Sequence, residues 1–358
     1  LICADPPRRV GLSATLGDYE GAEKWLKAGT DRRTVTPACA PGGAKIRLAV
    51  ESFMEEPDAE NNVDHTTAQQ PADDAYSYIF ENCWGRNCIV FANSRHDVEN
   101  LGAHLRHIAE SRHLPDIFYV HHGSISDGLR WEAEQAMRDE TRPAVTIATV
   151  TLELGIDIGQ LERVIQLHAC HSVSSLVQRL GRSGRRGEPS ELWAVCPETR
   201  LDDPSLMDRV PWNLLQTIAC IQLYVEERWI EPFQAPRYPF SLLYHQTMSV
   251  LHSHGELSPA GLAQRVLTLP PFRHVNAEQY RSLLRHLIAI DHIEQTETKS
   301  LIVGLKGENV VGDFRFYAVF ESSIDYEVLH DAHRIGSITY PPAPGQTVGL
   351  AGKAWEVT

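Results

Sequence analysis

Several features that would settle the class of this protein are missing from its sequence. No apolar run is long enough to cross a membrane as a helix, and no signal peptide is visible. The seven cysteines are odd in number and scattered, so they predict reduced thiols and no disulfide framework. Cys83 and Cys88 are too far apart for a zinc pair, and the segment His168–His171 fits packing at a sheet edge better than a metal site. These absences predict an intracellular, cytoplasmic protein.

Positive charge is also scarce. The formal net charge is −14 over 358 residues. This argues against a protein that covers nucleic acid non-specifically through a positively charged surface. Phosphate binding would have to rely on local basic patches. The length predicts two to three domains.

Two phosphate-handling motifs are missing as well. The chain contains no G-x-x-x-x-G-K-[ST], whose backbone and lysine cradle phosphates. It has no Asp-Glu-x-His or Asp-Glu-x-Asp run that could hold magnesium. A nucleotide site that used this chain would therefore need its phosphate cradle from elsewhere.

What the sequence does contain is an arginine- and glycine-rich segment, Gln178–Gly187, with four arginines and three glycines. Arg182 and Arg185 are three residues apart and would share a face within one helical turn. Guanidinium groups suit phosphate oxygens, so the pair could act as arginine fingers on a transferred phosphoryl group. The alternative is a solvated basic loop.

The segment before these arginines favours the functional interpretation. Val145–Thr149 and Arg163–Leu167 are short apolar runs typical of buried parallel strands. A glycine-bearing turn between them, Leu152–Gly159, carries the carboxylate of Asp157. Ligands bind beyond the carboxyl ends of such strands, so Thr149, Asp157 and the arginines are expected at one edge of a sheet.

Five segments together resemble the motifs of superfamily 2 helicases, and they occur in the expected order. Ser13–Thr15 resembles motif III, Ile89–Arg95 resembles motif IV, and His121–Ser126 resembles the motif that follows it. Thr149–Gly159 resembles motif V, and Gln178–Arg185 resembles motif VI.

The pattern is most similar to the large-helicase-related (Lhr) group. Leu152–Gly159 and His121–Ser124 are typical of that group, and later segments resemble its further domains: Gly304–Glu308, Phe316–Phe320, Ile335–Ile338 and Ala351–Trp355. Arg185-Arg186 departs slightly from the group, where many members have His-Arg, and this leaves the phosphate-facing chemistry intact.

The resemblance implies an α/β fold: a RecA-like parallel-sheet domain, then a winged-helix domain and a small antiparallel β-rich domain. The expected domains are a remnant of a first RecA-like domain, a linker, the second RecA-like (helicase C-terminal) domain, a helical linker with the winged helix, and the β-rich domain, at residues 1–35, 36–73, 74–200, 201–303 and 304–358. The missing phosphate and magnesium motifs would belong to the absent first domain, so this fragment alone is expected to be inactive as an ATP hydrolase.

Helical spacing supports the winged-helix expectation. Segments at 211–229, 242–254, 258–266 and 277–290 read as helices, and 293–303 reads as a hairpin. Arg281 and Arg285 lie four apart on the third of the winged-helix segments, where a nucleic-acid contact and a plain packing module are both open. The charges of this region nearly cancel, which weakens the case for a DNA reader.

The resemblance also assigns roles. Arg182 and Arg185 are expected as catalytic fingers, with the cofactor ATP and Mg²⁺ contacted by Gly155, Asp157, Gln178 and the same arginines. Asp157 would accept a hydrogen bond from the ribose, and Gln178 would help to order the phosphates. Contacts to single-stranded DNA or RNA are expected from eight residues: Ser94, Arg95, His122, Gly123, Ser124, Thr149, Arg281 and Arg285.

Three hypotheses follow. The first is the C-terminal portion of an ATP-dependent helicase or translocase that moves 3′ to 5′ on single-stranded DNA or an RNA:DNA hybrid, with a role in DNA repair and a repair-protein partner. The second is an ATPase-inactive module that binds nucleic acid. The third is a scaffold fragment that binds a protein through its β-rich end. Each assigned residue also has a simple structural alternative, such as a cap for Thr149 and Asp157 or a packed histidine for His122.

Overall fold

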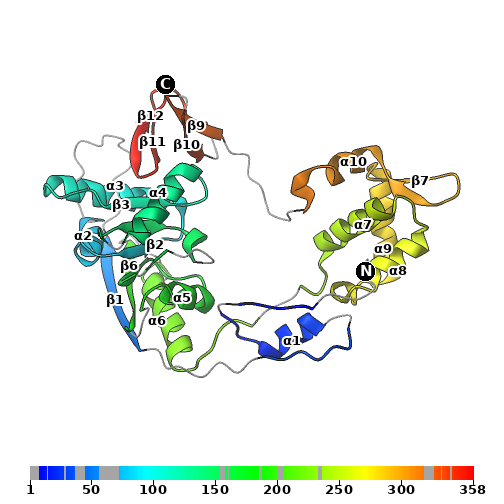
Figure 1. Ribbon diagram of the computed structural model, residues 1–358, viewed down its shortest axis with the longest axis horizontal. Coiled ribbons are helices and arrows are strands. Elements are labelled where there is room, and N and C mark those ends of the chain that lie inside the picture. The colour runs from blue at the N-terminus through cyan, green and yellow to red at the C-terminus, as the bar shows by residue number, and fades with distance from the viewer. Residues whose placement is uncertain are drawn as a thin grey trace. The chain divides into compact units, whose positions relative to one another are not determined.

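The structure is a computed structural model in which the chain forms two compact units (Figure 1). The sheet unit comprises Ser13–Gly17, Ala38–Glu231 and Ile324–Thr358, and the helical unit comprises Leu1–Leu12, Asp18–Pro37 and Pro232–Ser323. The residues that the structure describes are 8–13, 15–27, 30–36, 45–55, 72–139, 141–153, 158–159, 161–184, 188–199, 205, 207–232, 236–317, 326–331, 333–338 and 341–358.

A six-stranded parallel sheet forms the centre of the sheet unit. Its order is β1-β6-β5-β2-β4-β3, and every neighbouring pair is parallel. The strands are β1 (Ile46–Glu55), β2 (Cys88–Phe91), β3 (Phe118–His121), β4 (Val145–Ala148), β5 (Arg163–Leu167) and β6 (Ser190–Thr199). The expected α/β fold with strands at 145–149 and 163–167 is confirmed.

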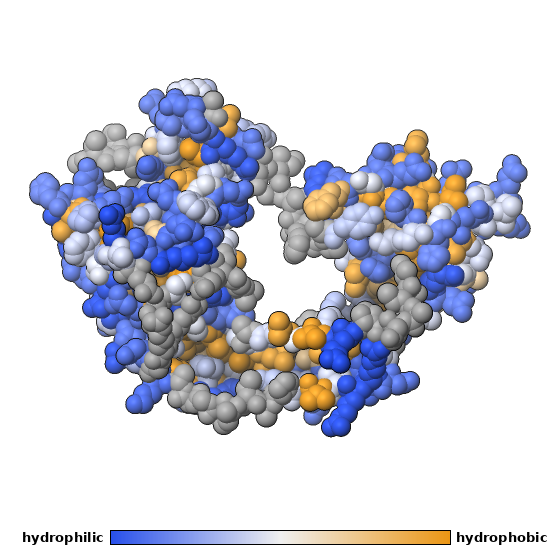
Figure 2. Space-filling model, viewed as in Figure 1, coloured by the Kyte–Doolittle hydropathy of each residue, from blue (hydrophilic) through white to orange (hydrophobic). Residues whose placement is uncertain are grey.

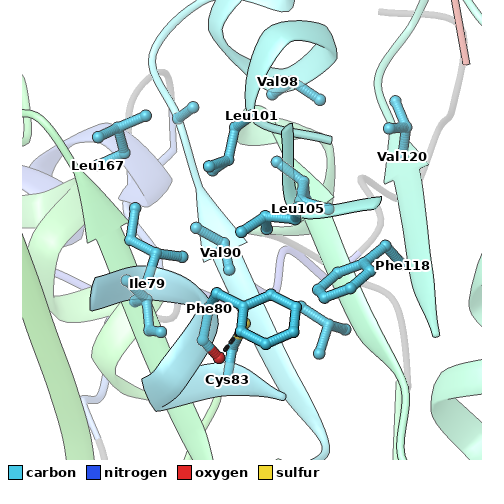
Figure 3. Close-up of a cluster of buried hydrophobic side chains, with 14 of the residues drawn as sticks. Ile79, Phe80, Cys83, Val90, Val98, Leu101, Leu105, Phe118, Val120 and Leu167 are labelled. Atoms are coloured by element: carbon cyan, nitrogen blue, oxygen red, sulfur yellow. Dashed lines mark hydrogen bonds between the residues drawn. The ribbon is translucent and has the colours of Figure 1, made fainter. Parts of the chain in front are cut away.

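Helices cover both faces of this sheet because successive strand residues point to opposite sides. Along β2, Val90 joins the core beneath α2 and α3, whereas Ile89 and Phe91 join the core on the other face. Figure 3 shows the first core, where side chains of α2 and α3 meet Val90 and Phe118. The helices are α2 (Ala72–Cys83), α3 (Arg95–Ser111), α4 (Asp127–Arg138), α5 (Val173–Leu180) and α6 (Trp212–Val225).

The five described cysteines are buried free thiols in this unit: Cys83, Cys88, Cys170, Cys196 and Cys220. Burial raises the pKa of the Cys88 thiol to about 12, because a thiolate would lose its hydration there. Polar and charged residues cover most of the surface of this unit that is visible in Figure 2. The five described cysteines are packing residues of the interior.

A small β module completes the sheet unit. We use this name for residues 326–358, which contain two antiparallel pairs, β9–β10 and β11–β12. The strands are β9 (Tyr326–His330), β10 (His333–Ile338), β11 (Thr347–Leu350) and β12 (Lys353–Glu356). Leu350 is buried in the core that also holds α3, so this C-terminal module packs on the sheet domain.

The helical unit has the element order expected for a winged helix. Three helices, α7 (Phe240–His254), α8 (Pro259–Leu267) and α9 (Ala277–Ala289), precede a hairpin of β7 (Ile293–Gln295) and β8 (Leu301–Val303). Ser258 caps α8 with a proline in the first turn, as expected from Ser258-Pro259. The unit also contains α1 (Tyr19–Lys27), none of whose residues, all described, is buried.

One expectation about this region is wrong. Residues from 304 onward were expected to alternate as antiparallel strands, but Leu305–Val311 forms helix α10 and Phe314–Tyr317 forms a 3₁₀ turn. Gly307 lies against the backbone of His292, and α10 contacts α7, so this segment packs within the helical unit in place of starting the β-rich domain. The chain passes from one unit to the other after residues 12, 17, 37, 231 and 323. The five domains named above stay predictions.

Candidate nucleotide and nucleic-acid site

Three neighbouring strands carry predicted site residues at one edge of the sheet. Ser94 follows β2, His122 follows β3, and Thr149 follows β4, and these strands are adjacent in the order β2-β4-β3. Because the strands are parallel, their carboxyl ends meet at the same edge, as the sequence predicts. The Thr149 N–H donates to the His121 carbonyl at 3.3 Å, which ties two of these ends together.

The start of α3 is the most exposed part of this edge. The Ser94 side chain caps the helix by accepting from the Asp97 N–H at 3.0 Å. Ser94 and Arg95 are both exposed, whereas Thr149 is only 9% exposed and caps the short 3₁₀ turn Val150–Leu152 without a side-chain bond. A helix N-terminus with an arginine beside it suits a phosphate oxygen.

The loop after β3 is buried more deeply than the sequence suggests. His122 is 1% exposed and Ser124 is 4% exposed, and only Gly123 between them is open to solvent. The His122 Nε2 lies 2.7 Å from the Glu99 carboxylate. These two side chains are thus held inside the protein, so a strand contact from this loop would have to use Gly123 and the backbone.

Helix α5 ends in the first residues of the arginine-rich motif, Gln178–Leu180, and meets the segment that resembles motif III. Gln178 Nε2 donates to the Thr15 Oγ1 at 3.0 Å and to the Ser174 Oγ at 3.3 Å. The Thr15 and Ser174 hydroxyls are 2.8 Å apart. Two motifs that are more than 150 residues apart in sequence therefore share one hydrogen-bond cluster.

Arg179 also belongs to the arginine-rich motif, but it is not among the site residues predicted from the sequence. It is 1% exposed, and its Nη2 lies 2.5 Å from the Glu153 carboxylate. Its Nη1 also donates to the Gln166 side chain, and its guanidinium lies over the Phe91 ring. A polar Gln166 within the buried strand β5 is the signal that could have indicated a buried partner.

Arg182 bonds to the segment that follows β4. Its Nε donates to the Glu153 carbonyl oxygen at 3.0 Å, and its Nη2 donates to the same oxygen. Arg182 is thus tied to the segment that follows Thr149. Its neighbour Ser183 pairs with Leu161, just before β5 begins, so this part of the motif lies toward the amino ends of the strands and not at the edge where Thr149 emerges. The other predicted finger, Arg185, lies outside the described residues, as do Gly155 and Asp157.

A cavity of about 360 Å³ opens beside α5. Its lining residues are Thr15, Ile46, Glu153, Val177, Gln178, Leu180, Gly181, Arg182, Ser190 and Tyr224. Gln178 and Arg182 supply nitrogen donors of the kind that phosphate oxygens accept, so the donor set fits an anionic ligand. Among the described residues, no group of three or more His, Cys, Asp or Glu side chains could hold a metal ion.

The remaining predicted contacts lie on α9 in the helical unit. A capping box of Asn276 and Gln279 starts the helix, and Tyr280 and Leu284 anchor it in the core. Arg281 and Arg285 are exposed and form no ion pair with any other residue that the structure describes. They belong to a different unit from the sheet edge, so the predicted strand contacts are divided between two parts of the chain.

Burial lowers the pKa of two histidines near the sheet edge. Desolvation lowers the pKa of His121 below its ordinary value of 6.5, although the Glu134 carboxylate at 3.4 Å opposes the shift. Desolvation also lowers the pKa of His168, which has a left-handed backbone with φ of 62°.

Within the described part of the chain, no helix is long and apolar enough to span a bilayer.

Comparison with known proteins defines the class of the sheet unit. Residues 73–187 match the helicase conserved C-terminal domain. The structure is similar to that of the Mycobacterium smegmatis helicase Lhr bound to ssDNA and AMP-PNP, with a TM-score of 0.66, 26% identity, and 86% of this chain and 38% of that chain covered. Residues 73–187 are thus similar to a helicase C-terminal domain in sequence, and the structure is similar to that of an Lhr helicase.

Sequence relatives narrow the group. The chain is 31% identical over 182 residues to the ATP-dependent helicase Lhr-Core of Sulfolobus acidocaldarius, covering 49% of this chain and 19% of that protein. It is 29% identical over 275 residues to the Lhr helicase/probable uracil glycosylase of Mycolicibacterium smegmatis, covering 68% and 17%. The chain thus spans less than a fifth of these relatives, and the similarities support its assignment to the Lhr group, which confirms the resemblance expected from the motifs.

Proposed function

We propose that this chain is a portion of an ATP-dependent nucleic-acid helicase or translocase that supplies an arginine finger and contacts to the strand. The observation that supports this best is the placement of Arg182. It lies on the wall of an anion-compatible cavity, beside Gln178 and Thr15, and bonds to the segment after β4. The similar Lhr structure, which was determined with ssDNA and AMP-PNP, supports a nucleotide and a strand as ligands.

In this proposal, ATP with Mg²⁺ supplies the free energy, and a first RecA-like domain holds its phosphates and metal. Arg182 exchanges its bond to the Glu153 carbonyl for the γ-phosphoryl oxygens, and Arg185 assists it. Gln178 donates toward the phosphates, and Gly155 and Asp157 contact the nucleotide. Arg179 stays in place, because its buried pairing with Glu153 positions the segment that Arg182 contacts.

Strand contacts in the proposal come from both units. At the sheet edge, the exposed Ser94 and Arg95 and the backbone of the 122–124 loop contact phosphates, with Thr149 beneath them. Arg281 and Arg285 add charge from α9. Movement from 3′ to 5′, a role in DNA repair, a repair-protein partner and a cytoplasmic location remain predictions from the resemblance.

The rate of ATP turnover tests whether Arg182 acts as an arginine finger. In a protein that joins this chain to an upstream P-loop domain, Arg182→Ala should lower nucleic-acid-stimulated ATP turnover by about a thousandfold, because fingers contribute on that order. Arg112→Ala is the matched control, since Arg112 is an arginine whose ion pair with Glu81 lies on the surface. Turnover that falls less than tenfold in Arg182→Ala would remove Arg182 from the catalytic site.

Binding of single-stranded DNA distinguishes a nucleic-acid-binding protein from a scaffold that binds only protein. The missing P-loop motif favours, as a second candidate, a module that binds nucleic acid without hydrolysing ATP. Fluorescence anisotropy with single-stranded DNA should show an affinity that falls as salt rises, because phosphate contacts release counterions. An absence of binding at low salt would leave the scaffold hypothesis, in which the β module binds a protein partner.

A further inference from the structure

The β module and the loop after β3 are joined by a chain of hydrogen bonds that centres on Glu99. Glu99 lies on α3, and its side chain is 8% exposed. One carboxylate oxygen lies 2.6 Å from the Ala351 N–H and 2.7 Å from the His122 Nε2, and the other accepts from the Gly352 N–H. A buried carboxylate is costly unless such donors surround it, so all three donors are needed to hold it there.

The same bonds define the protonation of His122. The Ser124 backbone N–H can only donate, and it lies 3.2 Å from the His122 Nδ1. The Nδ1 is therefore the acceptor, and the Nε2 carries the hydrogen that is donated to Glu99. Glu99 thus selects one neutral tautomer of His122, and that tautomer in turn holds the Ser124 backbone.

A second charged residue of α3 holds the other side of the same turn. Arg106 Nη1 donates to the Ala351 and Gly352 carbonyl oxygens at 2.9 and 2.6 Å. Ala351 and Gly352 have positive φ values of 58° and 68°, as a two-residue hairpin turn requires. The β11–β12 turn is therefore clamped by an anion on its N–H groups and a cation on its carbonyl groups.

Strand β10 approaches the loop directly as well. The Ser126 N–H donates to the Ile335 carbonyl at 3.1 Å, and the Ser337 N–H donates to the Ser124 carbonyl at 2.6 Å. A Cβ on Gly336 would lie 2.4 Å from that Ser124 oxygen, so only glycine allows this approach. The β module consequently contacts the 122–126 loop by two routes, through Glu99 and through β10.

We propose that Glu99 is a positioning residue that couples the docking of the β module to the conformation of the His122–Ser124 loop, and thereby to the grip on a nucleic-acid strand. The last part of this inference rests on the proposed function. When the β11–β12 turn leaves α3, Glu99 loses two of its three donors and water enters beside His122. The loop then loses its fixed backbone, and the exposed Gly123 no longer faces the strand in one arrangement.

Glu99→Gln in the full chain tests the proposal. The amide keeps the shape of the side chain but replaces one acceptor by a donor, which then faces either the His122–Ala351 pair or the Gly352 N–H. We expect at least tenfold faster hydrogen exchange at the amides of Ser124, Ala351 and Gly352, and at least tenfold weaker binding of a single-stranded oligothymidine. Glu110→Gln is the matched control, because Glu110 is an exposed residue of the same helix.

A spectroscopic signal separates positioning from general stability. In protein with ¹⁵N-labelled histidine, the ring nitrogens of His122 should report the Nε2–H tautomer in the wild type and a tautomer mixture in Glu99→Gln. The signal is identified by its loss in His122→Gln. A change that was only structural would lower the unfolding temperature and leave this tautomer signal unmoved.

Gly336→Ala tests the same coupling from the β-module side and applies even if Glu99→Gln does not fold. It should accelerate exchange at Ser124 and weaken strand binding by a similar factor, and the double variant should add little, because both changes act on one contact. Unchanged exchange at Ser124 in both single variants would overturn the inference. If the wild type binds no strand, the proposed function fails, and the exchange and tautomer results still decide the coupling.

Discussion

Charged residues are used in opposite ways in the two units. In the sheet unit, Arg179 and Glu153 are buried and paired, and Arg182 is bonded to the Glu153 backbone. On α9, Arg281 and Arg285 are exposed and have no ion-pair partner among the described residues. The first arrangement holds a geometry at low dielectric, whereas the second offers charge that salt can screen. The contrast is between charges that hold a geometry inside one unit and charges that are open to solvent on the other.

Removing the buried arginine should produce the largest effect. Arg179→Ala should lower the free energy of unfolding of the sheet unit by about 3–5 kcal/mol, because it leaves Glu153 buried without its partner. Chemical denaturation followed by circular dichroism would measure the change. On α9, Arg281→Ala should alter the unfolding free energy by less than about 0.5 kcal/mol, since its side chain is exposed.

A double variant sharpens this first prediction. Arg179→Met with Glu153→Gln removes both charges and should recover part of the loss, because neither partner is then left as an unpaired buried ion. A loss from Arg179→Ala no greater than that from Arg281→Ala would remove the contrast between the two regions.

Acidification should have a smaller effect, confined to the sheet unit. The pKa values of His121 and His168 are lowered by burial, so the unfolded chain binds protons more readily than the folded one. Stability should therefore be full above the ordinary histidine value of 6.5 and decline as the pH falls through it. Thermal unfolding measured between pH 8 and about pH 5 would show the decline.

His168→Asn is the variant that assigns this effect, since asparagine tolerates the left-handed backbone at this position. Its unfolding temperature should depend less on pH than that of the wild type. An equal dependence in both proteins would mean that other groups cause the decline.

The smallest expected change concerns α9 and appears only in the salt dependence. Arg281→Ala should reduce the slope of log affinity against log salt for single-stranded DNA by about 0.7, the value expected for one lost phosphate contact. The fold should be unaffected, and Glu278→Gln on the same helix should not reduce the slope. An unchanged slope would favour the packing alternative for α9.

The carboxyl edge of the sheet could be predicted because it depends on sequence patterns that extend over only a few residues. β-branched runs identify strands, and parallel strands bring their carboxyl ends together, so Thr149 follows from pattern, whereas Ser94 came from the resemblance to motif IV. The winged-helix order followed from helical spacing in the same way. After residue 304, antiparallel strands were predicted and occur from Tyr326 onward, but Leu305–Val311 was predicted wrongly. It is a short segment whose helical form depends on packing against α7 and His292.

The burial of His122, Ser124 and Arg179 could not be predicted from the sequence. Their motif positions marked them or their neighbours as functional, but exposure depends on what covers them. For His122 the partner is Glu99, and for Ser124 it is β10, which lies more than 200 residues later in the chain. Such contacts have no periodic signal, because they arise when distant segments meet.

The sequence by itself determined the class of the fold, the order of the helicase motifs and the edge of the sheet where most of them gather. These depend on strand and helix periods and on parallel pairing, which act over a few residues at a time. Only the tertiary structure decided which of the charged and polar residues are exposed, which are buried in pairs, and that the C-terminal strands hold the loop after β3. Burial and pairing are properties of contacts between distant segments, so they are settled when the chain packs.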